Sequence, residues 1–154
     1  MATSNFFIHY VLYPLPHYVG VYNTSTIREA QYKKLPCYVV SNLAGEGHPG
    51  THWIGLVLFT DDIFYFDPLG DVCTSPTIIK FMCDKGYTSY KYMTRPIQNE
   101  FSSHCGYFVM SFFIFLESGR TMSDFFALFS DRSSDNDRIV RSIVDSYVEN
   151  ITLY

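Results

Sequence analysis

Apolar residues in the first half of the chain come in short runs, whereas those in the second half come in longer runs of helix length. Residues 37–43 and 52–59 are strand-like apolar runs, and the glycines and proline of 44–50 mark a loop between them. Residues 60–62, Thr-Asp-Asp, are typical of a hairpin turn, and 63–66 return as the partner strand. The pattern therefore predicts a β-hairpin on a buried sheet.

Helical spacing dominates after residue 75. Ser75-Pro76 is a typical N-cap and first-turn pair, and Gly119 is a typical stop after a long apolar run. Residues 87–93 alternate between apolar and polar side chains as a strand does. The expected helices cover residues 75–85, 105–117, 122–129 and 134–150. We therefore predict an α+β fold, in which a central mixed, mostly antiparallel β-sheet packs against helices.

The whole chain, residues 1–154, is expected to form a single domain. Its length fits one domain by the usual size range, and it contains no internal repeat or low-complexity stretch. The one polar cluster, residues 130–137, has the length of an ordinary loop between helices. No feature of the pattern divides the chain.

Charge and hydropathy exclude several classes of partner. The net charge is -4 and the pI is about 5.6, so the chain as a whole has no field that attracts phosphate backbones, and tight nucleic-acid binding is not expected. Residues 1–22 contain no Lys or Arg, whereas a secretory signal begins with basic residues. The longest strongly apolar run, 105–116, is shorter than the ~20 residues that cross a bilayer. We expect a soluble intracellular protein without membrane contact.

The four cysteines are Cys37, Cys73, Cys83 and Cys105. In a chain without an export signal, reduced thiols are the expectation. Their spacing contains no C-x2-C pair, and the histidines of the 44–52 segment lie in a loop rather than on one helical face, so no metal site is expected.

The segment 98–105 reads Gln-Asn-Glu-Phe-Ser-Ser-His-Cys and combines an amide with a thiol at the start of the long apolar helix. A helix N-terminus carries partial positive charge, which stabilises a thiolate on Cys105. The tetrahedral oxyanion of acyl transfer needs preorganised donors, and Gln98 Nε2 and the backbone N–H of Cys105 are candidates. His104 adjoins the thiol, but adjacent residues at a helix start point in different directions, so it is the weaker candidate for a base.

A base and a carboxylate lie on the predicted hairpin. A turn centred near Asp61 pairs residue 52 with residue 69 or 70, which brings His52 and Asp67 to the same end of the hairpin at ~3.3 Å per residue. A bulge or a one-residue slip in register would put them on opposite faces. With the correct parity, Asp67 orients the imidazole that activates Cys105, although an Asp before a Pro is also a common turn former.

Three further residues are candidate substrate contacts. Trp53 follows the candidate base and either lines a substrate groove, covers the imidazole or packs in the core. Asn42 and the loop that ends at Gly50 are expected to form one wall of a cleft, where glycine lets a substrate backbone approach closely. A plain loop is the alternative for that segment.

These motifs together resemble the adenovirus-type cysteine endopeptidases, whose type member is adenain, within the larger set that includes the SUMO and NEDD8 deconjugating proteases. The resemblance is carried by Gly-Thr-His-Trp at 50–53, Phe-Asp-Pro-Leu-Gly at 66–70, and Gln98 seven positions before Cys-Gly-Tyr-Phe at 105–108, and it covers roughly residues 18–116. It implies a general base at His52, an acidic third member at Asp67, an oxyanion-hole glutamine at Gln98 and a nucleophile at Cys105.

The resemblance also implies substrates and partners. Viral members of the family cleave precursor proteins at glycine-containing sites during virion maturation, inside the infected cell, in the nucleus or the particle. Viral enzymes carry Glu in the acidic position, whereas Asp is the deconjugase choice. They are activated by a basic disulfide-linked peptide and by DNA, but the residue at the linking position is Tyr87 here and the nearest thiol is Cys83. Together with the acidic pI, this argues against either activator.

Two other classes of function remain open from the sequence. A deconjugase that removes ubiquitin-like modifiers needs the same narrow cleft for a Gly-Gly tail. A binding module on a retired protease scaffold is the other alternative, although the intact set of four residues argues against it. Taken alone, Cys105 on an apolar helix is more often a packing thiol than a nucleophile, so the joint pattern carries the interpretation.

Overall fold

The computed structural model describes residues 3–45, 52–131 and 134–152. The strands are β1 (Tyr18–Tyr22), β2 (Cys37–Asn42), β3 (Trp53–Leu58), β4 (Ile63–Phe66) and β5 (Lys91–Tyr92). The helices are α1 (Asn5–Leu12), α2 (Pro76–Asp84), α3 (Cys105–Glu117), α4 (Met122–Phe126) and α5 (Asp135–Thr152), with a short 3-10 helix, η1 (Ile27–Glu29). The predicted α+β class is confirmed.

The five strands form one mixed sheet in the order β1-β2-β3-β4-β5. The central strand β3 is antiparallel to both of its neighbours, β2 and β4, and each edge strand runs parallel to its neighbour. In the central hairpin, Gly55 pairs with Phe66 and Leu58 with Ile63, which is the register that the turn at residues 60–62 predicts. The hairpin therefore ends with residues 52 and 67 at one end of the sheet.

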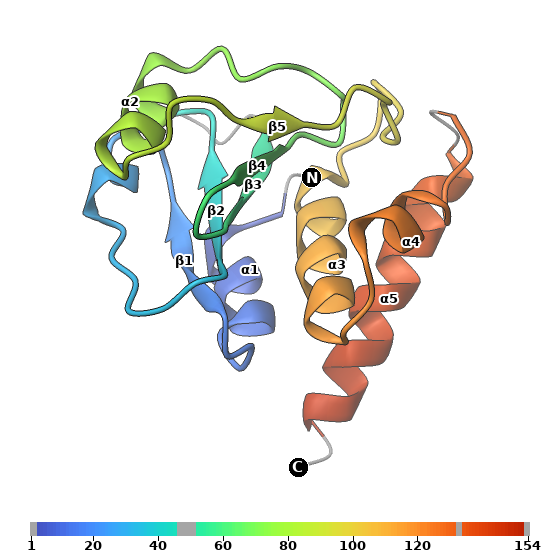
Figure 1. Cartoon of the computed structure of the whole chain (residues 1–154). Helices are drawn as coiled ribbons and strands as arrows, with labels where there is room; N and C mark the ends of the chain where they lie inside the picture. Colours follow the sequence, from blue (N-terminus) through green and yellow to red (C-terminus); the bar gives the residue numbers. More distant parts are fainter. Residues whose placement is uncertain (1–2, 46–51, 132–133, 153–154) are drawn as a thin grey trace.

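Helices cover both faces of the sheet and bury two separate clusters of apolar side chains. One cluster, with Ile27, Ile78 and Phe81, lies where η1 and α2 cover one face. The other is larger and is built on α3, which lies between the sheet and α5 (Figure 1). Alternate residues of β2 and β3 enter the two clusters, as the period of a strand requires.

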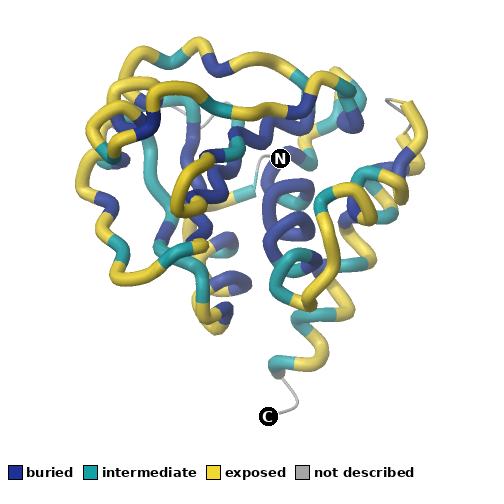
Figure 2. Tube along the Cα trace, viewed as in Figure 1, coloured by how far each residue is buried: buried dark blue, intermediate teal, exposed yellow. Residues whose placement is uncertain are grey.

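Helix α3 is apolar on nearly all sides, because it is enclosed by the sheet, α1, α4 and α5. Most of its length has the colour of buried residues in Figure 2. Phe108, Phe112 and Phe113 are fully buried. Cys105, the first residue of α3, is therefore held in place by the packing of the whole helix in the core. Among the described helices, none combines the length and hydrophobicity needed to cross a membrane.

Two elements near the N-terminus were not predicted, and two others are shorter than predicted. Helix α1 begins after Ser4, whose Oγ accepts a hydrogen bond from Phe7 N at 3.2 Å, and buries Ile8, Val11 and Leu12. Strand β1 follows it and pairs with β2. The strand predicted over 87–93 is confined to β5, and the helix predicted over 122–129 ends at Phe126. Short segments of this kind take their structure from packing rather than from local pattern.

Candidate active site

His52 and Asp67 meet at one end of the central hairpin. His52 directly precedes β3 and Asp67 directly follows β4, and extension of the Gly55–Phe66 register places Asp67 opposite Ile54, two residues from His52. The two side chains therefore have the same parity, and no slip separates them. His52 Nε2 lies 2.6 Å from Asp67 Oδ1, and the Asp67 side chain is only 3 % exposed.

Asp67 is also a turn former, as its position before Pro68 suggested. The same Oδ1 accepts a hydrogen bond from Leu69 N at 2.9 Å, and Gly70 N donates to Asp67 O at 2.8 Å. Gly70 adopts a φ of 78°, which glycine tolerates far better than other residues. The turn thus fixes the carboxylate that faces His52, so a place in the turn does not exclude the expected role of Asp67 in orienting the imidazole.

Cys105 is the first residue of α3 and is 5 % exposed. Its sulfur lies close enough to the His52 imidazole to raise the pKa of that ring. Because His52 Nε2 faces Asp67, the nitrogen left for the thiol is Nδ1. The structure therefore brings the three predicted residues together, with the imidazole between the carboxylate and the sulfur.

The imidazole of His52 is held in its charged form. Burial lowers the pKa of His52, but the hydrogen bond to the Asp67 carboxylate, the charge of that carboxylate and the nearby Cys105 sulfur raise it, with a net change from 6.5 to about 10. The imidazolium is therefore favoured at neutral pH, next to a sulfur at the positive end of a helix. A thiolate-imidazolium pair is the form of cysteine that attacks carbonyl carbon.

Gln98 is buried, with 2 % of the residue exposed, and is held by the turn that follows Asp67. Its backbone N–H and that of Ile97 both donate to Pro68 O at 3.0 Å, so the turn after Asp67 also positions the glutamine. Gln98 Nε2 donates to Ser102 O at 3.0 Å. An amide nitrogen carries two hydrogens, so one remains for an oxyanion.

Of the three predicted substrate contacts, two line one open pocket of about 560 Å³. Trp53 belongs to the core cluster and borders this pocket, while Asn42 borders it and accepts a hydrogen bond from Ala44 N at 2.8 Å. Neither His52 nor Cys105 lines this pocket, so it borders the candidate site through Trp53 and does not contain those two residues. Gly50 lies outside the described residues.

Thr3 is a residue of this site that sequence reasoning missed. Trp53 Nε1 donates to Thr3 O at 2.8 Å, and a Cβ on Gly106 would meet the Thr3 side chain at 2.8 Å. Thr3 and Ser4 border both the pocket at Trp53 and a second one that contains His104 and Tyr107. No motif marks Thr3, because its place depends on how α1 packs against α3.

The ring of His104 contacts Asp137 and Tyr107. Its Nδ1 lies 3.4 Å from Asp137 Oδ2, and its ring lies 5.4 Å from the Tyr107 ring. Its ring partners are therefore on α5 and α3 rather than at Cys105, which agrees with its weaker standing as a base.

All four cysteines are free thiols, and Cys83 is the exposed one. Burial raises the pKa of the Cys37 thiol to about 11 despite the charge of Lys85, and burial also raises the pKa of Cys73. Both are therefore poor nucleophiles at neutral pH. Among the described residues, no three His, Cys, Asp or Glu side chains gather in a way that holds a metal ion.

Comparison with solved structures finds proteases. The ASFV pS273R protease is 16% identical with a TM-score of 0.57, over 93% of this chain and 66% of that one, so the chain spans slightly less than two thirds of its length. The SUMO protease Ulp1, with its catalytic cysteine oxidized to a sulfinic acid, is 17% identical with a TM-score of 0.53, over 95% and 75%.

In sequence, no family model and no curated protein matches the chain. The likeness therefore lies in the fold, which agrees with the resemblance that the motifs suggested. The chain has the fold of the SUMO/Ulp1-like cysteine proteases.

Proposed function

We propose that the chain is a cysteine endopeptidase. The observation that carries the proposal is that His52 is held between Asp67, at 2.6 Å, and the thiol of Cys105 at the head of α3. A packing histidine needs neither a buried carboxylate on one nitrogen nor a cysteine on the other. The fold supports the same reaction class, since its structural neighbours are proteases.

The first half of the reaction forms a thioester. Cys105 Sγ attacks the scissile carbonyl carbon, and the π electron pair moves to the oxygen, where the second N–H of Gln98 and the backbone N–H of Cys105 stabilise it. The imidazolium of His52 then gives its proton to the leaving amine as the C–N bond breaks. Asp67 keeps the imidazole oriented throughout.

The second half releases the product. His52, now neutral, takes a proton from water, and the hydroxide attacks the thioester carbon. Collapse of this second tetrahedral intermediate breaks the C–S bond and restores the thiolate. The chain's own side chains supply every proton transfer, so the proposal includes no metal and no cofactor.

The proposed substrate is a protein or peptide with glycine near the scissile bond. The nucleophile is 5 % exposed, and Thr3 lies against Gly106 right beside it. A strand without side chains is the one that enters so narrow a space. By likeness to the viral group we place the activity in precursor processing during virion maturation, in the host cell nucleus or the particle.

The SUMO protease likeness favours a second candidate function, removal of a ubiquitin-like modifier. Such a modifier ends in a flexible tail that suits the same narrow cleft, and Asp67 is the acidic residue that the deconjugases use. The two candidates differ in what the rest of the protein recognises. A substrate comparison therefore separates them, whereas mutation of the shared chemistry does not.

We also propose that no disulfide-linked peptide activates this chain. Tyr87 occupies the linking position, is buried, and donates a hydrogen bond from its hydroxyl to Phe59 O. The nearest thiol, Cys83, is exposed at the end of α2. An activating peptide or DNA is therefore not required in the proposal, and addition of either to the assay tests this.

Alkylation with iodoacetamide across pH 5 to 9 tests the proposed pair of Cys105 and His52. Mass spectrometry identifies which cysteine is modified. We expect Cys105 to be labelled faster than exposed Cys83 at neutral pH despite its burial, because the imidazolium of His52 stabilises a thiolate beside it. Cys83 thus serves as the control within the same molecule. Equal pH profiles for the two would contradict the proposal and favour an inactive scaffold.

Cleavage of two substrate sets then separates the candidates. One set is a library of peptides with glycine at each position around the scissile bond, and the other is a panel of ubiquitin-like modifiers with a C-terminal fusion. We expect cleavage of glycine-containing peptides, which Cys105→Ala abolishes. Cleavage confined to the modifier fusions would select the deconjugase instead.

A further inference from the structure

Two residues in the first turn of α5 form hydrogen bonds with the segment that carries Gln98. Asn136 is fully buried, and its Nδ2 donates to Ile97 O at 2.8 Å, directly before Gln98. Asp137 Oδ1 accepts a hydrogen bond from Ser102 Oγ at 2.9 Å, four residues after Gln98. The glutamine therefore lies between two contacts to neighbouring residues of one helix.

Ser102 passes the contact with Asp137 on to the amide of Gln98. Its hydroxyl donates to Asp137 Oδ1 and accepts from His104 N at 3.0 Å, so both of its roles in hydrogen bonding are filled. Its carbonyl accepts from Gln98 Nε2 at 3.0 Å. The carboxylate of Asp137 thus fixes the one acceptor that orients the Gln98 amide.

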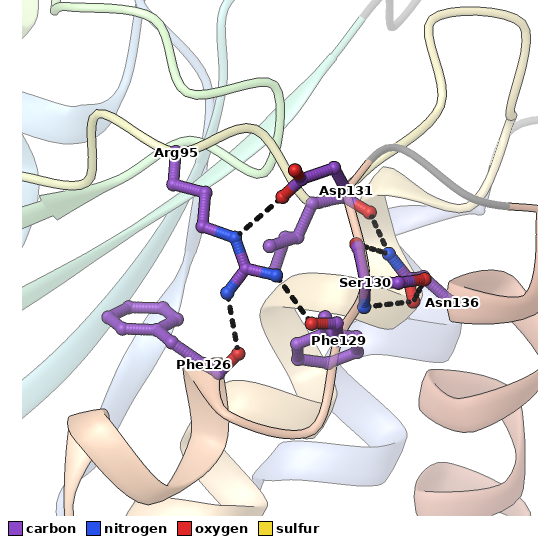
Figure 3. Close-up of polar contacts among 7 residues, drawn as sticks. Arg95, Phe126, Phe129, Ser130, Asp131 and Asn136 are labelled. Carbon is purple, nitrogen blue, oxygen red and sulfur yellow. Dashed lines mark hydrogen bonds and ion pairs between the residues drawn. The ribbon is translucent and has the colours of Figure 1, made fainter.

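The position of α5 is itself set from the other end of the same segment. Arg95 Nε lies 2.9 Å from Asp131 Oδ1, and its Nη1 and Nη2 donate to Phe126 O and Phe129 O (Figure 3). Asn136 in turn binds the backbone of Ser130 through its side chain (Figure 3). Hydrogen bonds therefore join residues 126–131, which lead into α5, to Arg95, and Asn136 of α5 to Ile97 of the same segment.

We propose that Asp137 is a positioning residue for the oxyanion hole, acting through Ser102 on the amide of Gln98. The inference rests on the proposed protease function. Among the described residues, the hydrogen-bond and ion-pair partners of Asp137 are Ser102 and His104 rather than Cys105 or His52. Its removal leaves the thiolate intact and misplaces the donor that stabilises the oxyanion.

The hydrogen bond, rather than the charge, is the expected cause. Asp137→Asn keeps an oxygen that accepts from the Ser102 hydroxyl and removes the negative charge at the start of α5. Asp137→Ala removes both. Asp145 lies on the same helix, is exposed, and pairs with Arg141 at 3.9 Å, so Asp145→Ala is the matched control.

The test compares two reactions of the same thiol. An acylated glycyl-glycine nitrile adds to Cys105: the Sγ–C bond forms, one π pair of the nitrile moves to nitrogen, and that nitrogen takes the proton of the His52 imidazolium and occupies the oxyanion hole. Iodoacetamide alkylates the same sulfur and forms no such intermediate. The ratio of the two reports the oxyanion hole separately from the pair of Cys105 and His52, and neither requires turnover of a substrate.

We expect Asp137→Ala and Ser102→Ala each to weaken nitrile binding by about 10- to 100-fold, with the double variant little worse than either, because they act in one chain of contacts. Asp137→Asn and Asp145→Ala should stay within about threefold of the wild type. All variants should be alkylated at the wild-type rate.

Two results overturn the inference alone. One is wild-type nitrile affinity in Asp137→Ala with normal alkylation of Cys105. The other is an equal loss in Asp137→Asn and Asp137→Ala, which would assign the effect to charge. Slow alkylation of Cys105 in the wild type would instead overturn the protease function and this inference with it.

Discussion

The two halves of the candidate site are built in different ways. His52 and Asp67 flank adjacent strands of one hairpin and lie 15 residues apart in sequence. The positions of Gln98 and Ser102, which lie in a loop, are set by a hydrogen bond to Asp137. Asp137 is 35 residues beyond Ser102 and belongs to α5. The acid-base half is therefore set by strand register, and the oxyanion half is set by how the last helix docks.

The turn at Asp67 joins the halves. Its Pro68 carbonyl accepts hydrogen bonds from the backbone N–H groups of Ile97 and Gln98, while its Asp67 carboxylate faces His52. Local structure thus produces the pair of His52 and Asp67, whereas the proposed oxyanion hole at Gln98 requires tertiary packing. Mutations in the first half should alter thiol chemistry, and mutations in the second should alter acyl transfer without altering the thiol.

The largest effect is expected for Cys105→Ala. Loss of the nucleophile should lower kcat for a glycine-containing peptide by roughly 10⁴-fold or more. The thermal unfolding midpoint should change little, because the variant loses one small side chain at the start of a well-packed helix. Retained cleavage would show that another residue carries the reaction.

His52→Ala should be nearly as severe for cleavage, and it breaks the first half alone. The pKa of His52 is raised above 6.5, so the imidazolium supports the thiolate at low and neutral pH and is lost as the pH rises through about 10. Alkylation of Cys105 in His52→Ala should therefore fall by about 100-fold at pH 6 and approach the wild-type rate near pH 9.5. A pH-independent difference between the two proteins would contradict the ion pair.

Gln98→Ala breaks the second half alone. We expect kcat to fall by about 10²- to 10³-fold, with KM changed much less, because the donor acts in the transition state. Alkylation of Cys105 should be unaffected. A rise in KM with unchanged kcat would assign Gln98 to substrate binding instead.

Asp67→Asn should have a smaller effect. The amide oxygen can still accept from Leu69 N and from His52 Nε2, so the turn and the orientation of the ring are kept while the charge is lost. We expect about a tenfold loss of kcat and a lower pKa of His52, measured by NMR titration of the imidazole. Full activity would mean that the carboxylate serves the turn only.

The smallest expected effect is one of stability at the junction of the two halves. Gly70 and Gly86 both have positive φ, but a Cβ on Gly70 would meet Pro96 N at 2.9 Å, whereas nothing lies within 4 Å of one on Gly86. Gly86→Ala should cost about 1 kcal/mol of unfolding free energy, and Gly70→Ala about 1–3 kcal/mol more.

Chemical denaturation of both variants measures this difference. Gly70→Ala should also weaken the nitrile adduct more than alkylation, because Arg95 and Pro96 lead into the segment of Gln98. Equal unfolding free energies for the two variants would contradict the close packing of the turn against that segment.

Strong local patterns predicted much of the fold. The hairpin register, and with it the shared parity of His52 and Asp67, follows from a turn at residues 60–62. The helix of Cys105 has the predicted bounds, Cys105–Glu117, because a long apolar run with a glycine after it leaves few alternatives. These features depend on neighbours in sequence, so pattern is enough.

Other features have no local signal. Helix α1 is short, and its buried residues contact α3, far away in sequence. Thr3 reaches Trp53 and Gly106 only because α1 docks there. The start of α5 shows Asp135, Asn136 and Asp137 as ordinary polar residues of a helix N-terminus, and nothing in their order tells which one faces Gln98.

The sequence by itself determined the inventory of chemistry: a thiol, an imidazole, a carboxylate and an amide, with the first at a helix start and the next two on one hairpin. The tertiary structure alone decided the anchorage of Gln98 through Ser102 to Asp137 and the contacts of Thr3 with Trp53 and Gly106. The physical reason is range. Hydrogen bonds along a strand or helix repeat with a fixed period, whereas contacts between distant segments depend on how whole faces of apolar side chains pack.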